Sequence, residues 1–192
     1  MRIFFGATLP ENTKTQTENI QEELRNNIDG IRIEAREKLH ITLHFIGDFM
    51  PEKIESLFSS VSGEVKRSGF KSSLTEVDGL SYFPSEKIRR GIWIDCRDDG
   101  TLGAIAETVK SVAEKFGVIP ERRAFRPHIT IARFRGEGGT NRKNYLDLQK
   151  LWSNGKLSIE RFFPKSIALF ESTLKSSGSE YEVLSDIPLI EG

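Results

Sequence analysis

The sequence predicts an α+β fold of two similar lobes, each with an antiparallel sheet backed by helices, and a cleft between the lobes. The triplet His-Ile-Thr occurs twice, starting at His40 and at His128, each time before an aliphatic residue. Predicted strands and amphipathic helices recur in both halves of the chain. Several connections between predicted strands are short, which favours antiparallel pairing. We expect one bilobal domain over residues 1–192, because no linker or low-complexity segment divides the chain.

In the first half of the chain, short or alternating apolar runs predict strands and periodic apolar residues predict helices. Strands are expected at 2–8, at 31–33 and from His40 to the Gly47-Asp48 stop. Ile20 and Leu24, at i and i+4, give a helix at 11–27 one buried stripe. Pro51 opens a second helix. Its apolar stripe consists of Ile54, Leu57, Phe58 and Val61.

The second half of the chain again combines predicted strands with predicted helices. Strands are expected at 71–80, 91–96, from His128, at 156–163, 166–174 and 179–184, with a loop at 82–85 and a turn at 176–178. The most regular helix is expected at 102–116, where seven apolar residues form one stripe. A second helix is expected at 141–152, after a flexible glycine turn at 136–139. That turn lacks a following Lys-Ser/Thr, so it is no phosphate-binding P-loop.

Composition and charge are those of a soluble globular protein. The 28 Lys and Arg residues balance the 28 Asp and Glu residues, which excludes a global polycation that coats nucleic acid. Residues 121–143, however, carry seven basic side chains against two acidic ones. This cluster suits a phosphate, and a solvated Arg-rich loop is the alternative. Cys96 is the only cysteine, so no internal disulfide is possible and a reducing cytoplasm is expected. No apolar stretch approaches transmembrane length, and nothing in the sequence demands an oligomer, so we expect no membrane segment and a monomer.

The periodicity of the first histidine strand separates two faces. Successive strand side chains point to opposite sides, so Ile41, Leu43 and Phe45 are expected on the core side. The other face is expected to carry His40, Thr42 and His44. The second strand repeats this, with His128 and Thr130 opposite Ile129 and Ile131. If both strands face one cleft, two imidazoles and two hydroxyls meet there.

Two imidazoles can divide acid and base roles near neutral pH, since their unperturbed pKa is about 6.5. Phosphoryl transfer needs such a pair, one group to activate the nucleophile and one to protonate the leaving oxygen. Hydroxyl and guanidinium groups can hold the phosphate oxygens. No metal is needed. A zinc site at His40 and His44 is rejected, because the segment is a predicted strand and lacks the Glu of the helical His-Glu-x-x-His motif.

Two runs of residues resemble the paired motifs of the two-histidine phosphoesterases: HITLHFIGD from His40 and RPHITIAR from Arg126. Within this superfamily the chain is most similar to the RNA 2′,3′-cyclic phosphodiesterases, also called 2′-5′ RNA ligases. The run RIFFGA from Arg2, and LFESTL from Leu169 with Tyr181, fit the same family. The resemblance implies a bilobal α+β fold and opening of a terminal 2′,3′-cyclic phosphate to a 2′-phosphate, without metal or cofactor. The implied substrate is an RNA end or a small cyclic nucleotide.

By this resemblance His40 and His128 are catalytic, while Thr42, Thr130 and Arg133 bind the substrate phosphate. We expect His40 to protonate the leaving O3′ and His128 to activate water. In strict alternation Arg133 would lie on the face opposite His128. The strand must therefore end or bulge after Thr130 if Arg133 is to reach the phosphate.

Aromatic residues suggest a place for the nucleobase. Phe83, in the expected loop, is a candidate for stacking on a base, whereas Trp93 lies in a strand and is expected to pack. His44 is expected at the cleft wall or the surface, and Cys96 in the core. Arg126 is expected to line the cleft or to hold a nearby carboxylate.

The sequence is also compatible with two alternatives. Ligation is the reverse reaction and would use the same residues, joining a cyclic phosphate end to a 5′-hydroxyl. A non-catalytic module that binds RNA ends would keep the fold and the basic segment. The two matched His-Ile-Thr copies favour the enzyme, because binding alone does not need a pair of acid–base groups.

Overall fold

The computed structural model describes residues 1–85, 89–119, 123–135, 148–153, 157–176 and 178–190. Its strands form one eight-stranded antiparallel sheet in the order β4-β5-β6-β3-β1-β7-β8, with β2 paired to β6 off this path. The strands are β1 (Arg2–Thr8), β2 (Ile31–Ile33), β3 (His40–Asp48), β4 (Glu76–Pro84), β5 (Arg89–Arg97), β6 (His128–Phe134), β7 (Ser166–Lys175) and β8 (Gly178–Pro188).

The two halves of the sheet meet at one backbone pair. β3 pairs with β6 only through Ile41 and Ile129, which we call the central pair. By contrast, β3 pairs with β1, and β6 with β5, over much of their length. The central pair separates the half β4-β5-β6-β2 from the half β3-β1-β7-β8. The predicted bilobal α+β fold is confirmed, with its two sheets continuous through this pair.

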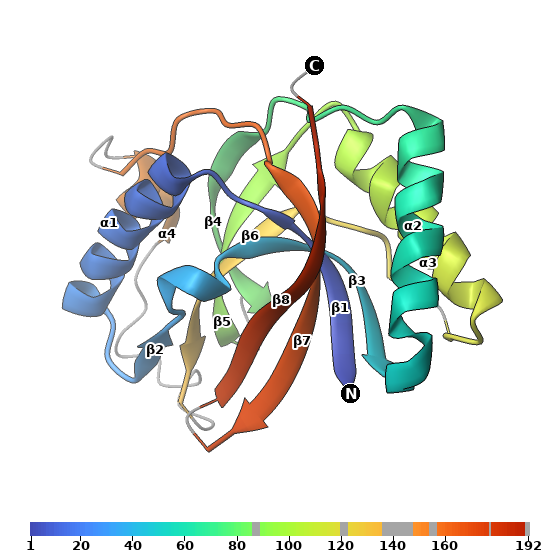
Figure 1. Cartoon of the computed structure of the whole chain (residues 1–192). Helices are drawn as coiled ribbons and strands as arrows, with labels where there is room; N and C mark the ends of the chain where they lie inside the picture. Colours follow the sequence, from blue (N-terminus) through green and yellow to red (C-terminus); the bar gives the residue numbers. More distant parts are fainter. Residues whose placement is uncertain (86–88, 120–122, 136–147, 154–156, 177, 191–192) are drawn as a thin grey trace.

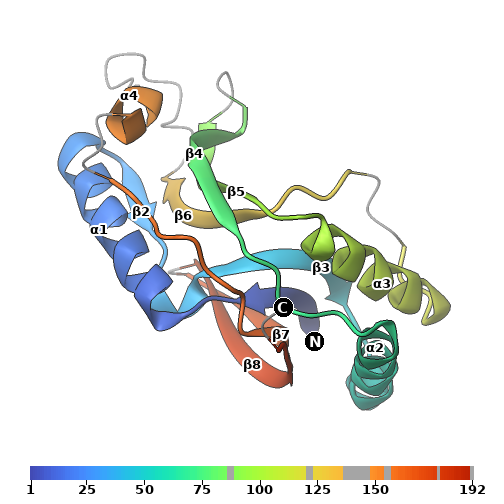
Figure 2. The same cartoon turned by 90° about the horizontal axis from the view of Figure 1, so that it is seen from above.

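Each half is backed by two helices. α1 (Glu11–Asn27) contacts β2 and β6, and α4 (Leu148–Ser153) contacts β4. On the other half, α3 (Thr101–Lys115) packs on β3 and α2 (Ile54–Ser68) packs on α3. Both views show α1 and α4 at one end of the molecule and α2 and α3 at the other (Figures 1 and 2). Single 3₁₀ turns precede β3 and α2, at Arg36–Lys38 and Pro51–Lys53.

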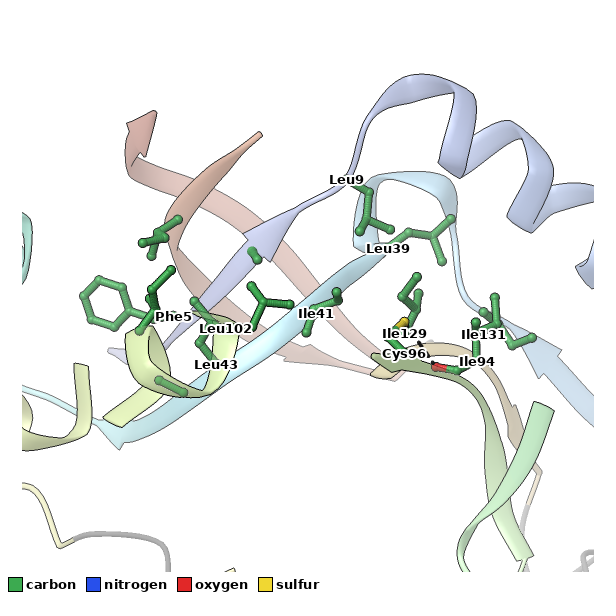
Figure 3. Packing of buried hydrophobic residues seen from close by; sticks show 14 of the residues in the cluster. Phe5, Leu9, Leu39, Ile41, Leu43, Ile94, Cys96, Leu102, Ile129 and Ile131 are labelled. Atoms are coloured by element: carbon green, nitrogen blue, oxygen red, sulfur yellow. Dashed lines mark hydrogen bonds between the residues drawn. The ribbon is translucent and has the colours of Figure 1, made fainter. Parts of the chain in front are cut away.

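The hydrophobic core runs beneath the central pair without a break. Ile41 and Ile129 have no exposed surface, and Leu43, Ile94 and Leu102 belong to the same cluster (Figure 3). α3 buries the stripe predicted from its sequence, made of Leu102, Ile105, Ala106, Val109, Val112 and Ala113. Burying an aliphatic side chain contributes about 1.5–3 kcal/mol. Core packing therefore holds the two halves together where backbone pairing is sparse.

Most predicted elements are confirmed, and β1, α1 and β2 have the predicted bounds. The strand expected at 71–80 is misplaced, because β4 spans Glu76–Pro84. Residues 82–84 are therefore strand, not loop. Gly91 explains this extension, since it pairs with Phe83 and leaves room for the Phe83 ring over the sheet.

The strand expected at 156–163 is wrong for the described part, 157–163. Only Phe162 forms a bridge there, exchanging backbone hydrogen bonds of 2.8 and 3.0 Å with Thr75. Apolar residues recur in this segment because Leu157, Ile159 and Phe162 are buried against the core, although the segment is not a strand of the sheet. Of the expected helix at 141–152, residues 148–152 lie in α4. Residues 141–147, the glycine turn at 136–139 and Ser177 lie outside the described residues.

Gly91 and Gly63 provide a matched test of this packing. A Cβ on Gly91 would lie 2.3 Å from the Phe83 ring and 2.4 Å from the Ala132 carbonyl oxygen. Gly91→Ala should therefore destabilise the protein by about 1–3 kcal/mol, as overpacking does. Gly63 is exposed inside α2, and a Cβ there would meet nothing within 4 Å. Gly63→Ala should instead stabilise by about 0.4–1 kcal/mol. Urea unfolding at 25 °C measures the free energy of unfolding of both variants. An equal change in the two would contradict the close packing of Gly91.

Candidate active site

The central pair places the two sequence-predicted histidines side by side. His40 immediately precedes Ile41 at the start of β3, and His128 immediately precedes Ile129 at the start of β6. Both imidazoles line one cavity, together with Thr42 and Thr130. The structure therefore brings together the four residues of the two copies, as the sequence predicted.

Both imidazole rings are held in the same way. Nδ1 of His40 lies 2.6 Å from the Lys38 carbonyl oxygen, and Nδ1 of His128 lies 2.7 Å from that of Arg126. Because a carbonyl oxygen only accepts, Nδ1–H is the donor and Nε2 is the acceptor in each neutral ring. Nε2 of His40 lies 2.9 Å from the Thr42 hydroxyl, which can donate to it. Each ring thus enters the site with an Nε2 atom that can take up a proton.

A β-bulge follows the threonine in both histidine strands. In β3, Thr42 pairs with Gly6 and His44 with Phe5, so Leu43 is the extra residue. In β6, Thr130 pairs with Trp93 and Ala132 with Ile92, so the extra residue is Ile131. Such a bulge shifts the alternation of side chains by one position. The fifth residue after each histidine therefore turns to the face of that histidine.

In β6 the bulge brings Arg133 to the cavity, beside His128 and Thr130. The sequence argument required the strand to end or to bulge after Thr130, and the structure shows a bulge there. In β3 the bulge contradicts the predicted faces. Phe45 is 52% exposed and lines the cavity, although strict alternation placed it in the core. His44 is buried instead, and it still reaches the cavity wall.

A buried carboxylate that the sequence analysis missed holds Arg133. The Nε–H group of Arg133 donates to Glu34 Oε1 at 2.7 Å, and the Glu34 side chain is only 8% exposed. The backbone N–H of Glu34 donates to the carbonyl of the bulged Ile131 at 3.0 Å, and Gln21 Nε2 donates to the same oxygen at 2.9 Å. Glu34 thus fixes both the bulge and the guanidinium. No motif marks Glu34, which follows the short strand β2.

An aromatic stack supports His128. The Trp93 ring lies 3.7 Å from the His128 ring at an interplanar angle of 21°, and the Phe83 ring stacks on Trp93 at 4.8 Å. Trp93 therefore packs, as expected, but against the predicted catalytic ring. Phe83 lies in β4 rather than in a loop, and it lines the cavity. The Arg133 guanidinium lies 5.5 Å over the Phe83 ring. Stacking of Phe83 on a nucleobase stays a prediction.

His40 is enclosed more tightly than His128. Its ring lies 4.9 Å from Phe4, 5.3 Å from Phe170 and 5.5 Å from Tyr181. The close packing depends on Gly6, because a Cβ there would come within 2.9 Å of the His40 ring. Burial disfavours the charged imidazolium and lowers the pKa of His40 to about 4.

Opposing effects act on the pKa of His128. Burial also lowers its pKa, but the hydrogen bond to the Arg126 carbonyl and the charge of Asp95 act in the opposite direction. Asp95 pairs with His128 across the β5–β6 ladder and forms a 2.8 Å ion pair with Arg126. Arg126 therefore fulfils both expectations, since it lines the cavity and holds a carboxylate.

The cavity is large, at about 760 Å³, and basic side chains lie around it. From the basic segment, Arg123, Arg126 and Arg133 line it, whereas Arg122, Arg142 and Lys143 lie outside the described residues. Within the described ranges, no group of three or more His, Cys, Asp or Glu side chains could hold a metal ion. None of the described helices is long and apolar enough to cross a membrane.

The chain is similar in sequence to known phosphodiesterases and in fold to a solved structure. The family model described as LigT like Phosphoesterase matches residues 8–94. An RNA 2′,3′-cyclic phosphodiesterase of Methanocaldococcus jannaschii is 28% identical over 97% of this chain and 99% of the relative. One of Escherichia coli, also named RNA 2′,3′-cyclic phosphodiesterase, is 31% identical over 72% of this chain and 75% of the relative. A crystal structure of a Thermus thermophilus protein superimposes with a TM-score of 0.78 at 23% identity, covering 100% and 99% of the two chains.

The enclosure of His40 predicts its titration. In the free protein we expect the His40 imidazole to stay neutral down to about pH 5, because its pKa is held at about 4. Inorganic phosphate in the cavity should raise the pKa of both histidines, since a nearby negative charge favours the imidazolium. Long-range ¹H–¹⁵N NMR spectra across pH, with and without phosphate, measure this. A His40 that titrates near 6.5 and ignores phosphate would refute this account of the site.

Proposed function

The chain belongs to the LigT-like phosphoesterase family, and we propose that it is an RNA 2′,3′-cyclic phosphodiesterase that forms a 2′-phosphate. The observation that carries this proposal is the pair of imidazoles, His40 and His128, each with an Nε2 acceptor in one cavity. Water attacks phosphorus, the bond from phosphorus to O3′ breaks, and one proton passes from water to the base while the acid gives one to O3′. The pair of histidines is regenerated by exchange with solvent.

The remaining polar groups would bind the phosphate. The hydroxyls of Thr42 and Thr130 and the guanidinium of Arg133 line the cavity beside the imidazoles. Because Glu34 occupies Nε of Arg133, the two terminal nitrogens are the groups available to phosphate oxygens. These donors would stabilise the charge that builds on the non-bridging oxygens in the transition state. The same donors would bind and orient the phosphate, so the proposed reaction needs no metal ion.

We assign the acid role to His40 and the base role to His128, as expected from the sequence. This assignment requires the substrate phosphate to raise the pKa of His40, because His40 is neutral in the free protein at pH 7. An opposite charge within about 4–6 Å favours the charged form of a side chain. The neutral Nε2 of His128, steadied by Trp93, would take the proton of the attacking water.

Ligation, a cytoplasmic location and a monomeric state stay predictions from the sequence. Ligation runs the same proton transfers in reverse, so the same cavity would serve it. A binding module without activity is the weaker candidate. It would have no use for two rings fixed through Nδ1 in the same way.

The direct test is turnover of a short RNA that ends in a 2′,3′-cyclic phosphate, in EDTA, followed by ³¹P NMR. We expect the wild-type protein to form a 2′-phosphate, and His40→Ala and His128→Ala each to lower kcat by about 10²–10⁴-fold. The double variant should lose little more than either single variant, because the two groups act as a unit. Circular dichroism checks that the variants fold. If the wild type binds the RNA without turnover, the phosphodiesterase is rejected in favour of a binding module. A 3′-phosphate product would show that O2′, not O3′, is the leaving oxygen.

A further inference from the structure

Two buried polar residues, one from α1 and one from the end of β2, hold the bulge that turns Arg133 into the cavity. The carbonyl oxygen of the bulged Ile131 accepts hydrogen bonds from the Glu34 backbone N–H at 3.0 Å and from Gln21 Nε2 at 2.9 Å. Gln21 Nε2 also donates to the Glu34 carbonyl oxygen at 2.8 Å. We call Gln21 and Glu34 the bracket. It ties β6 to α1 and to the end of β2, and these three elements contact one another (Figure 1).

Both N–H groups of the Gln21 amide are used in the bracket. Gln21 is only 3% exposed, and its two partners are carbonyl oxygens, so the NH2 end of the amide must face them. A buried amide that lost such partners would destabilise the fold, because it could not regain them from water. Gln21 therefore fixes the backbone of β6 against the backbone that follows β2, directly at the bulge.

The Glu34 carboxylate sets the orientation of the Arg133 guanidinium. Glu34 Oε1 accepts from Nε–H at 2.7 Å, and the guanidinium carbon lies 5.5 Å over the Phe83 ring. One contact fixes the edge of the planar group and the other fixes its face, so the two terminal nitrogens keep one direction. The Arg133 side chain is 41% exposed. Without these contacts it would lose more conformational entropy when it binds a phosphate.

Arg126 shows a different use of a carboxylate in the same cavity. It also lines the cavity, but Asp95 accepts from one of its terminal nitrogens, Nη2, at 2.8 Å. That contact occupies part of the guanidinium fork that would hold a phosphate. The Arg126 side chain is also more exposed, at 64%. At Arg133 the carboxylate takes Nε instead, which leaves the fork for the phosphate.

We propose that Gln21 and Glu34 are positioning residues of the reaction, which act on the substrate phosphate through Arg133. Gln21 fixes the backbone that carries Arg133, and Glu34 fixes the direction of the guanidinium fork. Glu34 reaches the cavity lining, but a carboxylate repels a phosphate, so it serves the site through its guanidinium partner. This inference rests on the proposed function, in which Arg133 binds the phosphate, and adds two residues to it.

The test is a double-mutant cycle on kcat/KM for a short RNA that ends in a 2′,3′-cyclic phosphate. We expect Glu34→Met, which removes the acceptor and keeps a side chain of similar length, to lower kcat/KM by about 10–100-fold, as misplacement of a catalytic group does. In the Arg133→Ala background the same change should alter kcat/KM by less than about twofold, because the guanidinium that Glu34 orients is gone. A role in folding alone would lower kcat/KM by the same factor in both backgrounds.

Two further variants separate positioning from loss of a surface charge. Glu34→Gln keeps an acceptor oxygen for Arg133 Nε–H, so it should retain much more of kcat/KM than Glu34→Met. Glu18→Met is the matched control, since Glu18 also pairs with a guanidinium, that of Arg36, but outside the cavity lining. It should leave kcat/KM unchanged. Circular dichroism and urea unfolding check that each variant folds.

Gln21→Met tests the other half of the bracket. We expect a loss of kcat/KM of about tenfold or more, again without further effect in the Arg133→Ala background. Gln16→Met is the control on the same helix, because Gln16 Oε1 accepts from the Glu160 backbone N–H at 3.0 Å, outside the cavity lining. An equal loss in Gln21→Met and Gln16→Met would remove Gln21 from the bracket.

Binding of inorganic phosphate separates a failed bracket from a failed enzyme. If the wild type hydrolyses the cyclic phosphate and Glu34→Met is equally active, or loses the same factor in both Arg133 backgrounds, the bracket is rejected and the proposed function stands. If the wild type hydrolyses nothing, the proposed function fails and the Kd for phosphate decides. Glu34→Met should then raise this Kd by about tenfold or more. An unchanged Kd, or a wild type that does not bind phosphate, rejects the bracket as well.

Discussion

The central pair, Ile41 with Ile129, is the contact on which the site depends. A backbone hydrogen bond contributes only about 0.5–1.5 kcal/mol to stability, so the pair is fixed by the apolar core around it. Both isoleucines are fully buried. Because each histidine directly precedes one of them, the core sets the spacing of the two imidazoles. Because the strands separate on either side of the pair, the same contact leaves the space that forms the cavity.

The two bulges then decide which side chains face that space. Both follow the threonine of a His-Ile-Thr copy, so His, Thr and the fifth residue after His share a face in each strand. The fifth residue is Arg133 in one strand and Phe45 in the other. The site is therefore symmetric in its backbone and asymmetric in its chemistry, with a cation for phosphate on one side and an open aromatic ring on the other. The enclosure of His40 and the acidic neighbour of His128 add a second asymmetry.

The sequence predicted the parts of this arrangement that depend on local pattern. The paired motifs identified both histidines and both threonines, and apolar periodicity located the helices and most strands. The faces of β3 were misassigned after Thr42, because alternation cannot reveal a bulge. For β6 the same reasoning gave only a condition, namely that the strand must end or bulge after Thr130 if Arg133 is to reach the cavity. Glu34 was missed, since a carboxylate becomes informative only when burial and its partner are seen. The bounds of β4 were predicted wrongly, because they depend on the contact of Gly91 with Phe83 on the neighbouring strand.

The central claim is that both imidazoles act on one phosphate held between β3 and β6. The most direct measurement is a crystal structure with a trinucleotide that ends in a 2′-phosphate. We expect Nε2 of His40 and Nε2 of His128 both to lie about 2.6–3.2 Å from oxygens of the same phosphate. Arg133 should contact that phosphate through its terminal nitrogens while Nε stays on Glu34. A phosphate that contacts only one histidine, or lies outside the cavity, would contradict the account.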